Sequence, residues 1–134
     1  MDLSRPFDAL AAIDTRSPDA VAAAIDAVLA ARVDGWDGAF LFEAVDNVAR
    51  LYEGRREGYL ACDTPYHDLR HAMETALATA RLVDGWEITL ARTRGSLGAE
   101  AALLAVVLAL LHDVGFLRRT EEANVKGASF FHEH

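Results

Sequence analysis

The sequence is poor in cysteine, in basic residues and in long apolar runs. A single cysteine, Cys62, allows no disulfide within the chain and favours a cytoplasmic location. Only 13 Lys and Arg face 21 Asp and Glu, and the net charge of −8 argues against binding to nucleic acid or to an anionic membrane. Residues 1–7 lack the pattern of a signal peptide, and the longest apolar run, 101–111, is too short to cross a bilayer.

The remaining pattern is helical. Ser17, Pro18 and Asp19 together form a helix start, with a capping hydroxyl, a proline and an acid at the positive helix end. Apolar residues at helical spacing predict helices over 18–32, 40–52, 66–85 and 99–111. The last of these is apolar nearly all round, which is typical of a central buried helix. With no alternation typical of strands, we expect an all-α bundle forming one domain over 1–134, with supporting helices in 1–60 and the chemistry in 61–134.

All the histidines lie at position 67 or later, in the second half of the chain. His67 and His71 are four residues apart, so we expect them to share one face of the third helix. His112 and Asp113 directly follow the apolar run, whose packing would hold them rigidly.

His71, His112 and Asp113 form a plausible metal-binding set. Imidazole suits Zn, Fe, Ni and Mn, and a carboxylate can bridge two ions. An aspartate at the end of a buried helix is costly unless a cation or a donor meets it. In the alternative interpretation these residues bind no metal. His112 then caps the helix C-terminus as a cation, Asp113 is solvated and His71 lies on the surface.

Two motifs about forty residues apart are characteristic together. The first is Tyr-His-Asp-Leu-Arg-His-Ala at 66–72, and the second is the apolar helix ending in His112-Asp113. The pair resembles the HD superfamily of metal-dependent phosphohydrolases, and most of all its cyclic-nucleotide phosphodiesterase branch, whose first motif reads Tyr-His-Asn-x-x-His-Ala. The resemblance covers 66–134 and implies an HD-domain-like helical bundle.

The resemblance implies a role for each matching position. His71, His112 and Asp113 would bind one or two divalent ions (Mn, Mg, Fe, Zn or Ni, which the sequence does not distinguish), with Asp113 bridging them and so taking part in catalysis. His67 would be the general acid that protonates the leaving oxygen. His134 matches a further histidine that serves a second metal or the phosphate. A frayed chain end is the alternative for His134.

Other residues have less defined roles. Asp68 stands where the phosphodiesterases have asparagine, and either orients a neighbouring histidine or is exposed. The substrate would be a nucleotide or another small phosphate ester. The basic side chains of Arg70, Arg118, Arg119 and Lys126 either attract this anion or are simply solvated.

The sequence also departs from the family at the first metal site, because no aspartate follows Asp113 to complete it. We therefore expect the bundle to be incomplete at its C-terminal end: the chain is a fragment, another chain supplies the ligand, or catalysis has been lost. An incomplete bundle would expose one face of the helix at 99–111 and favour a homo-oligomer, unless the first two helices cover that face.

Three other functions remain open on these residues. The first is a catalytically impaired HD domain that binds a ligand or a partner. The second is an HD-type di-iron oxygenase, and the third is a helical interaction module without metal.

Overall fold

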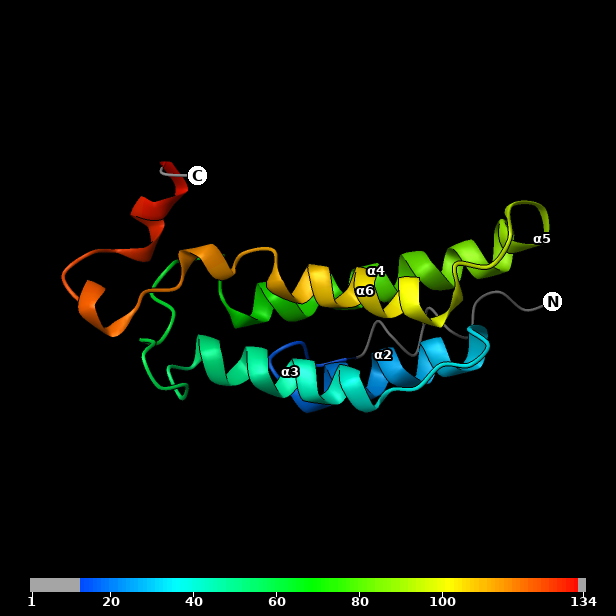
Figure 1. The fold of residues 1–134 in the computed structure, drawn as a ribbon, viewed down its shortest axis with the longest axis horizontal. Coiled ribbons are helices and arrows are strands. Elements are labelled where there is room, and N and C mark those ends of the chain that lie inside the picture. Colours follow the sequence, from blue (N-terminus) through cyan, green and yellow to red (C-terminus); the bar gives the residue numbers. More distant parts are fainter. Residues whose placement is uncertain (1–12, 133–134) are drawn as a thin grey trace.

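The computed structural model describes residues 13–132, and these are mostly helical, as the sequence predicts (Figure 1). Four long helices are α2 (Pro18–Arg32), α3 (Ala39–Tyr52), α4 (Leu69–Thr89) and α6 (Gly98–Leu111). The short elements are α5 (Ala91–Arg94) and the 3₁₀ helices η1 (Val114–Phe116), η2 (Thr120–Glu122) and η3 (Gly127–His132). Within the described residues the one strand-like feature is an isolated bridge between Tyr59 and Arg119.

The four long helices form a bundle around one hydrophobic core. α2 packs against α3 and α4, α6 packs against α4 and α3, and α3 also touches α4, so each long helix contacts at least two others. The largest fully buried side chains include Ile25, Leu29, Leu41, Met73 and Leu110. The N-terminal helices therefore supply half of the core on which α4 and α6 rest.

The start of α2 is confirmed as the sequence predicts it. The Ser17 hydroxyl accepts a hydrogen bond from the Ala20 N–H at 3.2 Å, Pro18 opens the helix and Asp19 lies in its first turn. This cap satisfies a backbone donor that the helix itself leaves unpaired.

The start of α4 differs from the prediction. Tyr66 has φ of +68°, and the His67 N–H donates to the Pro65 carbonyl at 2.8 Å, which together describe a tight turn that a helix cannot contain. The helix begins after Asp68, whose carboxylate accepts the His71 N–H at 3.0 Å. The expectation that His67 and His71 share a helix face is therefore wrong, because His67 lies in the preceding loop.

The far end of α4 is also longer than expected. The helix passes Gly85, the residue predicted to end it, and runs to Thr89. A glycine lowers helix propensity by about 1 kcal/mol without forcing a stop. The indole N–H of Trp86 donates to the Gly95 carbonyl at 3.0 Å and so ties the last turns of α4 to the loop before α6.

α6 is buried on one side only, which corrects the expectation of a central buried helix. Ala102 and Val106 face the core, whereas Leu104, Leu108 and Leu111 are 56%, 59% and 41% exposed. α2 and α3 pack on the inner side of the bundle and leave these three leucines uncovered. The exposed face that the sequence predicts is therefore present.

The stretch Gly98–Phe116 has the length and composition of a membrane span, with 19 residues and a mean hydropathy of 1.8. Core helices of soluble proteins meet the same criterion, so this is weak evidence for a membrane.

Candidate metal centre

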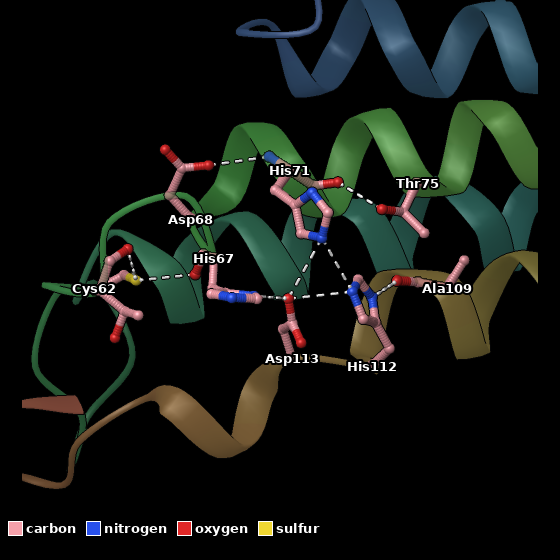
Figure 2. A network of polar contacts seen from close by, with 9 residues as sticks. Cys62, His67, Asp68, His71, Thr75, Ala109, His112 and Asp113 are labelled. Carbon is pink, nitrogen blue, oxygen red and sulfur yellow. Dashed lines mark hydrogen bonds and ion pairs between the residues drawn. The ribbon is translucent and has the colours of Figure 1, made fainter. Parts of the chain in front are cut away.

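Four side chains converge where α4 begins and α6 ends (Figure 2). Their common point is Oδ2 of Asp113, which lies 2.7 Å from His67 Nδ1, 3.1 Å from His112 Nε2 and 3.4 Å from His71 Nε2. The two Nε2 atoms of His71 and His112 are 3.2 Å apart. Among the described residues, His67, His71 and Asp113 offer ligand atoms that all lie within 4.8 Å of one another.

Separate elements hold these side chains in place. His71 lies in the first turn of α4, where Asp68 caps the helix through the His71 N–H. Asp68 is exposed, as one reading of the sequence has it, and it contacts His71 through the backbone N–H alone. His112 and Asp113 follow the last turn of α6, which is anchored by the fully buried Leu110.

The hydrogen bond of His112 fixes which of its nitrogens can bind a metal. Its Nδ1 lies 2.6 Å from the Ala109 carbonyl oxygen, which can only accept, so Nδ1 carries the proton. In the neutral ring the lone pair is then on Nε2, the atom that faces His71 and Asp113. His112 thus bonds the last turn of α6 and also presents a ligand nitrogen to the cluster.

One reading of the sequence had Asp113 solvated, and the structure shows that this reading is wrong. Its side chain is 13% exposed and surrounded by three imidazoles. A carboxylate in such a place needs a cation or donors. The donor set of imidazole nitrogens and a carboxylate oxygen fits Zn, Fe, Mn or Ni, so these residues suit the metal that the motifs imply.

His67 lies inside the cluster, held by contacts on two sides. Its Nδ1 meets Asp113, and its ring stacks on Phe116 with centroids 4.6 Å apart and an angle of 29° between planes. The sequence assigned His67 to proton transfer, whereas the geometry also places it among the groups able to hold a metal. Its catalytic role stays a prediction.

Two tyrosines border the cluster, and of these Tyr66 opens the first sequence motif while Tyr52 was not predicted as a site residue. The ring of Tyr66 is 73% exposed and lies 4.7 Å from that of His71. Tyr52 is buried, and the pKa of its phenol is raised by burial and then by the negative charge of Asp113. Tyr52 belongs to the apolar stripe of its helix, so the pattern identifies it only as core.

Three of the four predicted substrate-binding cations, Arg70, Arg118 and Lys126, lie beside acidic side chains. Arg70 Nε donates to Glu74 at 2.8 Å. Arg118 Nε lies 3.4 Å from Oδ1 of Asp63, and Lys126 Nζ lies 3.9 Å from Oδ2 of the same residue. A role in binding substrate stays a prediction for each of them.

One predicted position lies at the end of the chain: His134, the expected ligand of a second metal, is outside the described residues.

Comparison of the chain with models of protein families, with curated proteins and with solved structures finds no match in any of the three. The likeness to the HD superfamily therefore depends on the two motifs and on the chemistry of the cluster.

Proposed function

We propose that the protein is a metal-dependent phosphohydrolase acting on a nucleotide or a related phosphate ester. The observation that supports this most is the convergence of three imidazole nitrogens on one carboxylate oxygen of Asp113. His71, His112 and Asp113 would hold the metal. A metal bound there supplies an acidified water and polarises a phosphate oxygen.

The residues of the chain have distinct tasks in this proposal. Asp113 balances the positive charge of the site and orients His67 by accepting from its Nδ1 at 2.7 Å. Because Asp113 engages Nδ1, the proton for a leaving oxygen would be carried on His67 Nε2. The side chain of His67 is 36% exposed, so a substrate can approach it.

A second candidate is an HD-like domain that binds a ligand or partner without catalysis. Among the described residues the cluster contains one carboxylate, that of Asp113, where the family pattern implies two. Three or four protein ligands can hold a metal, but a single carboxylate gives less support to a two-metal reaction.

The first experiment is the metal content of protein purified without chelator or nickel, measured by mass spectrometry. We expect one or two equivalents in the wild type and almost none in His112→Ala or Asp113→Asn. Asp46→Asn, which alters an exposed acid paired with Arg50 on α3, should retain the metal. A wild type that stays empty after addition of Mn²⁺ or Fe²⁺ would contradict the phosphohydrolase and leave the binding module as the remaining candidate.

Turnover then separates the candidates. A panel of nucleotide monoesters and diesters should be hydrolysed by the metal-loaded protein, and His67→Gln should lose about 100-fold in kcat while keeping its metal. A metal-loaded wild type without turnover favours the binding module. Stoichiometric iron with a visible absorbance in air favours the di-iron oxygenase.

We also propose that copies of the chain associate through the exposed face of α6. Five exposed residues follow one another at alternating intervals of four and three, the spacing of a helix that packs against another helix: Leu97, Ala101, Leu104, Leu108 and Leu111. The five side chains of this apolar stripe carry no charge, and Glu100 is the one acid of α6, beside the stripe at its N-terminal end.

A further inference from the structure

We infer that Asp63 and Gly127, two residues outside the cluster, position the His67 ring against Asp113, with Phe116 transmitting the constraint. The inference deepens the proposed function, because it names what sets the orientation of the proposed general acid. The geometry that carries it involves no metal, so it can be tested separately.

The first step is a contact between two segments that are distant in sequence, which we call the joint: the hydrogen bond of Asp63 with Gly127, with Arg118 beside it. Asp63 lies four residues before His67, and its Oδ1 accepts the Gly127 N–H at 3.0 Å. The same oxygen faces the guanidinium of Arg118 at 3.4 Å, and the side chains of Asp63 and Arg118 are only 19% and 14% exposed. The loop that carries His67 is therefore fastened to the segment that follows Asp113.

The second step is the close approach of Gly127. A Cβ at position 127 would overlap the carbonyl oxygen of Phe116 and would lie 2.7 Å from Thr64 Oγ1 and 2.8 Å from Asp63 Oδ1. A backbone carbonyl cannot give way as a flexible side chain does. Lack of space rather than an unusual φ is thus the reason for a glycine here, and Gly127 supports the backbone of Phe116 directly.

The third step runs from Phe116 to the imidazole. The two rings stack 4.6 Å apart, while Asp113 holds His67 Nδ1 at 2.7 Å. The thiol of Cys62 donates to the His67 carbonyl at 3.4 Å and so restrains the backbone of the same residue. With its face against Phe116 and one nitrogen on Asp113, the ring is left with a single orientation.

The other two imidazoles do not depend on this joint. His71 is set by the cap of α4, and His112 by the carbonyl of Ala109 in α6. Disturbing Gly127 should therefore displace His67 while leaving His71 and His112 in place. This selectivity distinguishes positioning from a general loss of structure.

The test is Gly127→Ala, with Gly115→Ala as the matched control, because no atom lies within 4 Å of a Cβ built on Gly115. Imidazole ¹⁵N spectra of the metal-free proteins report the tautomer of each ring, and His67→Gln identifies the His67 signals. We expect the wild type and Gly115→Ala to show a proton fixed on His67 Nδ1. In Gly127→Ala the two nitrogens of His67 should give averaged shifts, while the His112 signals stay unchanged.

Turnover and metal affinity add a second readout. Gly127→Ala should bind metal within about threefold of the wild type and lose up to about 100-fold in kcat, the scale of a misplaced catalytic group. Asp63→Asn keeps an oxygen that can accept the Gly127 N–H, so it should retain more kcat than Asp63→Ala.

Two results would overturn the inference: His67 signals in Gly127→Ala identical to those of the wild type, or equal effects of the two glycine substitutions. If Gly127→Ala does not fold, Phe116→Leu removes the stacked ring and leaves the backbone oxygen, and it must release His67 in the same way. A wild type that binds no metal would contradict the proposed function and leave the tautomer result standing.

Discussion

The hydroxyl of Tyr52 is buried beside the cluster and has no hydrogen-bond partner among the described residues. A buried polar group without a partner reduces the stability of the fold, so Tyr52→Phe should raise the free energy of unfolding by about 1 kcal/mol. Urea denaturation measures this. Tyr66→Phe is the control, because Tyr66 is largely exposed and its change should stay within about 0.5 kcal/mol. A lower free energy of unfolding in Tyr52→Phe would show that the Tyr52 hydroxyl does have a stabilising partner.

Two weakly acidic side chains, the half-buried thiol of Cys62 and the buried phenol of Tyr52, make the stability of the fold decrease at alkaline pH. Burial raises the pKa of the Cys62 thiol above its ordinary value of 9.0, and it also raises that of Tyr52. Both groups stay protonated in the folded chain after they ionise in the unfolded one, so stability is complete below about pH 9 and falls as the pH rises further.

Denaturant titrations between about pH 8 and pH 10.5 measure this fall. Cys62→Ala should show a shallower decline than the wild type, because one of the two groups is gone. Identical slopes for the two proteins would mean that the thiol is not shielded from water.

At the level of single residues, the two motifs were sufficient to predict that His71, His112 and Asp113 lie together as possible metal ligands. The structure does bring them together, because a helix cap and a buried helix fix their positions. The geometry of His67 could not be predicted, since the positive φ of Tyr66 interrupts an otherwise helical pattern. The joint of Asp63 with Gly127 depends on two segments meeting in space, and no local pattern encodes that.

Between elements, α2 and α4 share an ion pair that the sequence does not reveal. Asp84 lies in α4 with its side chain 4% exposed, and its Oδ1 is 2.7 Å from Arg32 Nε at the end of α2. Removing one partner leaves the other charge buried and unpaired. Arg32→Met should therefore lower the free energy of unfolding by about 3 kcal/mol.

Thermal and urea unfolding of Arg32→Met test this, with Arg50→Met as the comparison. Arg50 pairs with Asp46 on the open surface of α3, and such pairs contribute about 0.5 kcal/mol. Equal losses in the two variants would show that Asp84 is not shielded as described.

The helices themselves were predictable from apolar spacing, and the errors fell at their ends. α2 and α3 lie where the pattern puts them, because the apolar periodicity continues along both helices, and Ser17 also caps α2. α4 starts later and ends later than predicted, since the Asp68 cap and the packing of Trp86 outweigh local propensity. The apolar composition of α6 concealed which of its faces the bundle would leave uncovered.

For the whole molecule, the net charge of −8 and the apolar stripe of α6 have opposing effects on association. If copies pair through the stripe, salt should strengthen pairing by screening the repulsion between two acidic chains. Sedimentation velocity of the wild type should show an oligomer that increases with salt. The double variant Leu104→Gln and Leu108→Gln should be monomeric.

Phe42→Gln serves as the control for this substitution, because Phe42 is exposed on α3 rather than on the stripe. It should leave the oligomer intact. A wild type that sediments as a monomer at every salt concentration would contradict the proposed pairing.

Both tryptophans lie far along the bundle from the three histidines of the cluster. Trp86 lies fifteen residues along α4 from His71, roughly 22 Å at the rise of an α-helix. Trp36 lies in the connection between α2 and α3, which Figure 1 shows at the same end as α5. Intrinsic tryptophan emission should therefore be insensitive to an ion bound at the cluster, and a change in emission on adding metal would report a rearrangement that travels the length of the molecule.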